Sequence, residues 1–359
     1  MKSFGFLSFG HYGPRGSGYE AADMLSQAVD LSVAADELGV NGAYFRVHHF
    51  ARQAASPMPL LSAIAARTKR IEVGTGVIDM RYENPLYLAE EAAALDLPSD
   101  GRVALGVSSG SPEPALRGWE AFGYEGSTDP RGADIARDKF DLFLRAVRGE
   151  ALAEADPAQF GRGRRLRVEP HSPGLASRIW WGAGSRDTAE WAAEQGVNLM
   201  SSTLLTEATG DAFADLQAEQ IARYRVAWRD AGHPGNPRVS VSRSVFPLMN
   251  DYDRQLFIRE SVGRDQIGVI DGLQSTFGRS YAGEPDQLVE ALKNDAAVMA
   301  ADSLMLTIPA QLGVDYNMHL LEAFATHVAP ELGWEPNHKG PTTGYADDEV
   351  PAVPEVPGP

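Results

Sequence analysis

Side chains suited to chemistry follow three apolar runs of this 359-residue sequence, namely His48 and His49, Ser108 and Ser109, and the segment 182–188. An imidazole can hold or transfer a proton near neutral pH, although a histidine that only packs in the core is the alternative. The segment 182–188 reads Gly-Ala-Gly-Ser-Arg-Asp-Thr. Free N–H groups at a helix start, with serine and threonine hydroxyls, favour a phosphate, whereas an ordinary N-cap by Ser185 is the simpler interpretation.

Composition excludes several other kinds of chemistry and several kinds of partner. The sequence contains no cysteine, so disulfides, thiolate nucleophiles and cysteine-ligated metals are excluded. The eight histidines show no convergent pattern, so we expect no metal site. The 32 basic residues face 49 acidic ones, and the resulting net charge of −17 disfavours nucleic acid and anionic membranes as partners. No apolar run approaches the ~20 residues of a membrane span, so we expect a soluble, cytoplasmic protein.

Strands and helices that would position these residues alternate along the chain. The apolar patterns predict eight strands, at 3–9, 43–47, 70–78, 102–108, 178–183, 197–201, 239–246 and 303–308. They predict helices between these strands, among them 57–68, 85–96, 133–147, 185–195 and 212–231. Eight such units predict an α/β fold, a (β/α)₈ barrel, whereas a doubly wound sheet needs fewer strands.

The remaining segments complete the expected domain organisation. We expect one domain over residues 1–333, with an insertion at 248–302 between the seventh and eighth strands that suits a lid or a substrate-facing segment. Residues 334–359 are rich in proline and are expected to form a flexible, disordered tail. Active sites of such barrels lie at the carboxyl ends of the strands, where the three chemical segments fall.

Four segments together resemble the bacterial-luciferase-like flavin-dependent monooxygenases. They are FRVHHF at 45–50, IEVGTGVI at 71–78 followed by Asn-Pro, VALGVSSG at 103–110, and GAGS at 182–185 followed by TAEWAA. The resemblance covers residues 3–330. It implies a barrel that binds reduced FMN supplied by a separate flavin reductase and uses O₂ to oxygenate a small organic substrate. It also implies a homodimer, formed through the helices at 57–68 and 85–96.

The resemblance further implies the roles of individual residues. His48 and His49 become catalytic, with His48 acting as a base or positioning the substrate. A cis peptide bond is implied between Gly76 and Val77. The cofactor-binding residues implied by the resemblance are Gly76, Val77, Ser108, Ser109, Ala183, Gly184, Ser185, Arg186 and Thr188, with the phosphate at Ser185, Arg186 and Thr188.

Two positions depart from the family pattern and keep alternatives open. Val47 stands where a carboxylate often precedes the histidine pair, and Ser109 stands where many members have an arginine that holds the cofactor phosphate. Arg186 or Arg81 could take over that contact. Alternatively, a hydroxyl residue at this position fits related enzymes that use a deazaflavin coenzyme of the F420 type, with Glu113 as an acid. A non-catalytic flavin-binding protein is the third hypothesis.

Two further groups of residues each have a structural and a functional interpretation. The basic run Arg162, Arg164, Arg165 and Arg167 is typical of a solvated loop, with docking of a reductase or contact with the cofactor phosphate as alternatives. Aromatic residues at strand ends suit either a substrate wall or the core; they are Phe9, Tyr12, Phe45, Tyr82 and Trp119.

Overall fold

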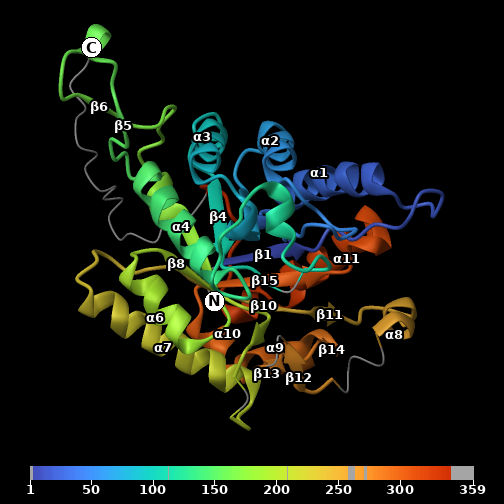
Figure 1. The fold of residues 1–359 in the computed structure, drawn as a ribbon. Helices are drawn as coiled ribbons and strands as arrows, with labels where there is room; N and C mark the ends of the chain where they lie inside the picture. The colour runs from blue at the N-terminus through green and yellow to red at the C-terminus, as the bar shows by residue number, and fades with distance from the viewer. Residues whose placement is uncertain (1–2, 112, 208, 258–262, 271–272, 341–359) are drawn as a thin grey trace.

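A closed barrel of eight parallel strands forms the centre of the computed structural model, which describes residues 3–111, 113–207, 209–257, 263–270 and 273–340 (Figure 1). In spatial order the strands are β1 (Ser3–Ser8), β15 (Ser303–Ile308), β10 (Val239–Arg243), β8 (Asn198–Ser201), β7 (Ile179–Ala183), β4 (Val103–Ser108), β3 (Glu72–Asp79) and β2 (Gly42–Phe45). β2 pairs with β1 and closes the ring. The predicted (β/α)₈ barrel is confirmed.

Helices surround this barrel, as Figure 1 shows. They are α1 (Ala21–Leu38), α2 (Pro57–Arg67), α3 (Pro85–Asp96), α4 (Ala133–Val147), α6 (Arg186–Glu194), α7 (Phe213–Asp230) and α11 (Gly313–His327). Local sequence fixes where they begin and end. The Asn84 side chain caps α3 by accepting from the N–H groups of Leu86 and Tyr87, and Gly39 ends α1 with a φ of 84°, a conformation that favours glycine.

Strand alternation divides the barrel residues between two environments. Residues such as Phe6, Phe45 and Trp181 belong to the large apolar cluster that includes side chains of the surrounding helices. The residues that alternate with these along the strands form a smaller cluster, which includes Leu7, Tyr44 and Trp180. Successive side chains of a strand point to opposite faces, so the second group lies inside the barrel.

Four side chains, which we call the barrel floor, fill the interior near the amino ends of the strands: Tyr44, Glu72, Trp180 and Arg238. Glu72 is the first residue of β3, and Arg238 directly precedes β10. The Arg238 guanidinium donates to both Glu72 oxygens, at 2.6 and 2.9 Å, and the Tyr44 hydroxyl donates to Glu72 Oε2 at 2.7 Å. The guanidinium also lies over the Trp180 ring. These contacts close this end of the barrel.

The segment between β10 and β15 contains more regular structure than its polar sequence suggested. It holds β11 (Val245–Pro247), α8 (Asp251–Phe257), β12 (Gln266–Ile270), β13 (Leu273–Phe277), β14 (Tyr281–Gly283), α9 (Pro285–Lys293) and α10 (Ala296–Ala300). β11 pairs with β14, whereas β12 and β13 form a small sheet with β9 (Leu204–Leu205). The strand expected at 239–246 is therefore divided, because only its first part continues the barrel.

A second long connection joins α4 to β7. It consists of α5 (Pro157–Phe160) and the hairpin of β5 (Ala153–Glu154) and β6 (Arg165–Leu166). The basic run lies here: Arg165 donates to the Leu152 carbonyl and Arg167 pairs with Glu169. None of these arginines lines the cavity described below, so the contact with a cofactor phosphate considered for them is not seen.

Folded structure continues past the expected domain boundary at residue 333. Trp334 is buried, its indole N–H donates to the Asn41 side chain at 2.7 Å, and its ring packs edge-on against Phe4. The Asn337 N–H donates to the Gly39 carbonyl at 2.8 Å. These contacts correct the boundary, since the fold extends to at least residue 340; the rest of the expected tail, 341–359, lies outside the described residues. Among the helices that the structure describes, none is long and apolar enough to cross a membrane.

Candidate active site

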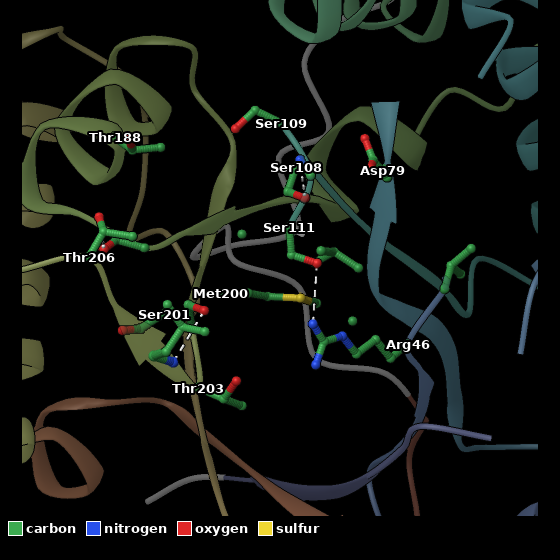
Figure 2. A pocket seen from close by; sticks show the side chains of 18 of the residues that line it. Arg46, Asp79, Ser108, Ser109, Ser111, Thr188, Met200, Ser201, Thr203 and Thr206 are labelled. Atoms are coloured by element: carbon green, nitrogen blue, oxygen red, sulfur yellow. Dashed lines mark hydrogen bonds between the residues drawn. The ribbon is translucent and has the colours of Figure 1, made fainter. Parts of the chain in front are cut away.

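A cavity of about 430 Å³ lies at the carboxyl ends of the barrel strands (Figure 2). Every strand contributes a lining residue, either from the strand itself or from the loop that follows it. One lining residue for each strand, in chain order, is Leu7, Arg46, Val77, Ser108, Gly184, Met200, Ser242 and Met305. The cavity therefore has the position at which barrel enzymes hold their substrates.

One wall of the cavity, which we call the hydroxyl wall, is built by the start of α6 and by the loop after β8. Its hydroxyl groups belong to Ser185, Thr188, Ser202, Thr203 and Thr206, and Ser109 and Arg137 also line the cavity. The Ser185 Oγ accepts from the Thr188 N–H at 3.3 Å and donates to the Thr188 Oγ1 at 2.9 Å. This wall thus combines the positive end of a helix with several hydroxyl groups.

Backbone carbonyls of this wall are already satisfied. The Ala183 and Ser185 carbonyls accept from the Gln220 side-chain amide, at 3.3 and 2.9 Å. The Gly184 carbonyl accepts from the N–H and the hydroxyl of Thr206, at 2.8 and 3.1 Å. Gln220 is fully buried. Because these oxygens are bound within the protein, they are not left to repel an anion in the cavity.

Two residues predicted to bind the cofactor lie away from the cavity. The Arg186 side chain pairs with Glu207 and Glu219, each at 2.8 Å, and its backbone N–H donates to Glu207 at 3.2 Å. The Ala183 side chain is buried in the apolar core behind the wall. Neither is among the lining residues, so the phosphate contact predicted for Arg186 is not seen. The other predicted cofactor residues, Gly76, Val77, Ser108, Ser109, Gly184, Ser185 and Thr188, all line the cavity.

The two histidines take different positions beside the cavity. His48 Nδ1 lies 2.9 Å from Glu113 Oε2; both side chains are buried, and Glu113 lines the cavity. His49 instead stacks on the Tyr82 ring at 4.0 Å and meets Phe122 edge-on. Burial is the largest influence on His49 and lowers its pKa, which favours the neutral ring. His48 is therefore connected to the cavity through Glu113, whereas His49 belongs to an aromatic cluster.

Arg81 secures the long loop that follows β4. Its Nη1 donates to the Arg131 carbonyl at 2.8 Å and its Nη2 to the Ser111 carbonyl at 2.7 Å, so it joins the two ends of this loop. Its Nε donates to Asp79 at 2.9 Å. The alternative that Arg81 replaces the missing phosphate-binding arginine is not supported, because its guanidinium is already bonded within the protein.

Sequence reasoning missed Arg46, Asp79 and Arg137 as lining residues. Arg46 is the second residue after Tyr44 and so returns to the interior face at the strand end, a signal that strand alternation offered. Of the five aromatic residues considered for a substrate wall, Phe9 lines the cavity. Tyr82 and Trp119 pack beside His49 and Arg81, and Phe45 belongs to the core.

Sequence comparison identifies the family to which this site belongs. The profile of the luciferase-like monooxygenases matches residues 1–257. The chain belongs to the luciferase-like monooxygenase family. A curated relative in this family, the alkanal monooxygenase alpha chain of Photorhabdus luminescens, is 26% identical over 219 residues, or 60% of this chain and 56% of the relative. The chain thus spans about half the length of several curated relatives that it matches.

Solved structures share the fold along nearly the whole chain. The oxygenating constituent of 3,6-diketocamphane monooxygenase from Pseudomonas putida, in complex with FMN, has a TM-score of 0.68 at 16% identity and covers 92% of this chain and 98% of its own. The coenzyme F420-dependent tetrahydromethanopterin reductase of Methanopyrus kandleri has a TM-score of 0.60 at 15% identity, covering 92% and 99%. These similarities concern the barrel fold.

The family assignment agrees with one feature of the site. The peptide bond between Gly76 and Val77 is cis, as the resemblance implied. Within the described parts of the chain, no group of three or more histidine or acidic side chains is placed to hold a metal ion. Of the two structures with the same fold, one is a complex with FMN and the other is an F420-dependent enzyme, so both cofactors are considered below.

Proposed function

We propose that this protein is a flavin-dependent monooxygenase that uses reduced FMN and O₂ to oxygenate a small organic substrate. The observation that carries the proposal is the combination, in one cavity, of the hydroxyl wall with the buried pair of His48 and Glu113. The first feature suits a phosphate and the second suits proton transfer. A flavin mononucleotide carries both a phosphate and a ring whose reaction with O₂ requires protons to be held or moved.

The residues present fit such a cofactor. At one end, Ser185, Thr188 and Thr206 would donate hydroxyl hydrogen bonds to the phosphate, with Arg137 supplying positive charge. Toward the barrel axis, Leu7, Val77 and Met200 offer apolar surface for a flat ring. Ser108 ends β4 and Ser109 follows it; both line the same cavity, as Figure 2 shows.

Chemistry at the ring requires the protein to manage protons and water. The bound flavin would supply the oxygen chemistry, as cofactors do in such enzymes. His48 is buried and contacts Glu113, so its imidazole is held in a fixed orientation from which it holds or moves a proton. The surrounding apolar side chains exclude water and so protect reactive species from hydrolysis. Val47, where a carboxylate often stands, is buried, and Glu113 supplies a carboxylate beside His48 from another strand end.

A deazaflavin-dependent oxidoreductase is the second candidate function. Two observations favour it: Ser109 stands where an arginine is common in FMN enzymes, and the contact between His48 and Glu113 suits an acid and base acting on a hydride-transfer substrate. Arg137, from α4, supports FMN because it lines the cavity that also contains the hydroxyl wall and replaces a charge that Ser109 lacks. A non-catalytic flavin-binding protein would keep the hydroxyl wall but has no need of a buried His48–Glu113 pair.

Anaerobic titration with each reduced cofactor tests the proposal. Binding is followed by the quenching of tryptophan fluorescence, and oxygen uptake is then measured after air is admitted to the complex. We expect reduced FMN to bind more tightly than the reduced deazaflavin and to support oxygen uptake above the rate of free reduced FMN in the presence of a substrate. Preference for the deazaflavin would support the second candidate, and tight FMN binding without any change in oxygen uptake would support the third.

Two partners follow from the proposed activity. A separate reductase would supply reduced FMN, and we propose that the protein acts in the cytoplasm. We also propose a homodimer through α2 and α3, because α3 exposes the Tyr87 side chain and the adjoining Leu97 is 47% exposed. We expect light scattering at micromolar concentration to give twice the chain mass of 38.7 kDa, and a monomer mass would reject the dimer.

A further inference from the structure

Arg46 extends into the cavity without a carboxylate partner. It follows β2, and its side chain lines the cavity from the side opposite Thr188 and Thr206 (Figure 2). Its Nη2 donates to the Ser111 hydroxyl at 3.3 Å. Among the residues that the structure describes, this is the one hydrogen bond of its guanidinium, and Arg46 forms no ion pair there. Most of its five N–H donors are therefore available to a ligand.

The surroundings hold this guanidinium in place without neutralising it. It lies over the Phe9 ring, 4.9 Å from the ring centroid. Burial lowers the pKa of Arg46, and the carboxylate of Glu113 opposes that effect. An arginine stays charged at neutral pH in spite of such a shift, so a largely desolvated positive charge faces the cavity. An anion that bonds to the guanidinium would recover the lost interactions with water.

Charges around the cavity indicate more than one anionic group in the ligands. Four arginines and two carboxylates line the cavity, although the whole chain has a net charge of −17; the six are Arg46, Arg81, Arg131, Arg137, Asp79 and Glu113. Arg81 is paired with Asp79, and Glu113 contacts His48. Arg137 lines the cavity together with the hydroxyl wall. Arg131 is exposed, and its backbone carbonyl accepts from Arg81. Arg46 lies on the side opposite Thr188 and Thr206, beyond the part of the cavity assigned to the phosphate.

We propose that Arg46 and Ser111 bind a carboxylate group of the substrate, which makes the oxygenated substrate an organic carboxylate. This inference rests on the proposed function, because it assumes that the cofactor phosphate lies at the hydroxyl wall. A planar guanidinium fork matches the two oxygens of a carboxylate. Phe9 and Leu7, which also line the cavity, offer apolar surface to the hydrocarbon part of such a substrate.

Glu113 allows a second test of how charge in the cavity affects the affinity for a carboxylate, because its charge is opposite to that of Arg46. It lines the same cavity and carries the charge that opposes an incoming carboxylate. Arg46→Gln and Glu113→Gln should therefore change the affinity for a carboxylate in opposite directions, whereas a neutral ligand should respond weakly to both. A purely structural role of Arg46 would not produce this dependence on ligand charge.

The experiment compares two probes of similar size, 4-fluorobenzoate and 4-fluorobenzamide, by ligand-observed ¹⁹F NMR. Both are titrated into the full chain with saturating FMN and, separately, without FMN in buffer containing inorganic phosphate to fill the hydroxyl wall. Arg46→Gln and the stem-preserving Arg46→Met are compared with Arg52→Gln, a matched change of an exposed arginine at the same strand end. Thermal unfolding of each variant checks that it is folded.

We expect wild type to bind the benzoate at least tenfold more tightly than the benzamide, and either Arg46 variant to lose that preference while Arg52→Gln keeps it. Glu113→Gln should increase the preference. Equal affinity of wild type for the two probes, or a preference that survives in both Arg46 variants, would overturn the inference. Loss of FMN affinity in Arg46→Gln without any benzoate preference in wild type would also overturn the inference, because Arg46 would then bind the cofactor and not the substrate. A benzoate preference without FMN binding would instead reject the proposed cofactor alone.

Discussion

Buried charged groups are hydrogen-bonded differently at the two ends of the barrel interior. At the barrel floor, Glu72 receives two hydrogen bonds from Arg238 and one from Tyr44, and the three side chains are nearly inaccessible to solvent. At the cavity, Arg46 has one hydrogen bond within the described residues and no ion pair, and the oxygens of Glu113 have only the close approach of His48. At the floor, Glu72, Arg238 and Tyr44 bond to one another, whereas at the cavity Arg46 and Glu113 keep polar atoms to which a ligand could bond.

This difference separates residues that stabilise the fold from residues that act on a ligand. A fully bonded buried ion pair contributes little net stability, yet it destabilises the protein strongly when one partner is removed. An incompletely bonded polar group costs stability in the free protein and gives affinity when a ligand supplies the missing bonds. Substitutions at the floor should therefore change unfolding, and substitutions at the cavity should change binding and turnover.

The largest effect is expected at His48. His48→Ala should lower turnover by roughly two to four orders of magnitude, because it removes the group that holds or moves a proton. FMN affinity and the thermal midpoint should change little. Steady-state rates, FMN titration and thermal unfolding on the same preparation check this expectation. A stable, FMN-binding His48→Ala enzyme with wild-type turnover would exclude His48 from the mechanism.

A floor substitution should act on stability instead. Glu72→Gln leaves the Arg238 charge without its buried partner, so the free energy of unfolding should fall by about 3–5 kcal/mol. Urea denaturation measures it, and Asp30→Asn, which breaks the exposed pair with Arg67, is the control with a change under ~1 kcal/mol. FMN affinity of folded Glu72→Gln should equal that of wild type. Similar changes in the two variants would contradict the assigned difference between the floor and the surface.

At the hydroxyl wall, a new negative charge should weaken cofactor binding. Ser185→Asp places a carboxylate beside the proposed phosphate and should raise the dissociation constant for reduced FMN by an order of magnitude or more. The matched control is Ser56→Asp, at the exposed N-cap of α2. Titration of both variants measures the effect, and equal affinities would place the phosphate elsewhere.

The smallest effect concerns pH and stability at Glu83, a partly buried residue that directly follows the helical turn Met80–Tyr82 after β3. Burial, with the nearby Glu91 as a second cause, raises the pKa of Glu83 from 4.5 to about 7. The folded state therefore binds the Glu83 proton more tightly than the unfolded state does. The contribution of this proton to the free energy of unfolding is fully present below pH ~4.5 and is lost as the pH rises toward 7. Allowing for solvent screening, we expect a loss of about 1 kcal/mol.

Urea denaturation at pH 4.5 and pH 7.5 checks this pH effect. The decrease in unfolding free energy should be about 1 kcal/mol smaller in Glu83→Gln than in wild type. Glu37→Gln, at an exposed position of α1, should retain the full decrease. A decrease of the same size in all three proteins would assign the pH dependence to other groups.

Most of the fold was predictable because each barrel strand leaves a local pattern. Runs of five to nine residues between helical segments predicted all eight strands. The strand at 239–246 was predicted too long, because Arg243 ends β10, with its side chain paired to Asp295 at the start of α10, and Val245 starts another sheet. The strands at 204–205, 266–270 and 273–277 were missed, since they are short and their polar segments carry no clear period.

The site was predictable in position and less so in detail. Ser108, Ser185 and Thr188 were predicted to lie at the site because they end or follow barrel strands, whose carboxyl ends converge. Arg186 pairs with Glu207 and Glu219, and sequence cannot show that these two carboxylates lie close enough to bind it. The contact of His48 with Glu113 depends on the path of the loop after β4, which Arg81 holds through backbone carbonyls and which no residue pattern reveals.

The central claim is that the cavity binds FMN with its phosphate at the hydroxyl wall. A crystal structure of the complex with FMN tests it most directly. The account expects phosphate oxygens within hydrogen-bond distance of the Ser185 and Thr188 hydroxyls, and the isoalloxazine ring between Val77 and the side of the cavity that carries Glu113. A phosphate bound away from α6, or a ring outside this cavity, would contradict the account.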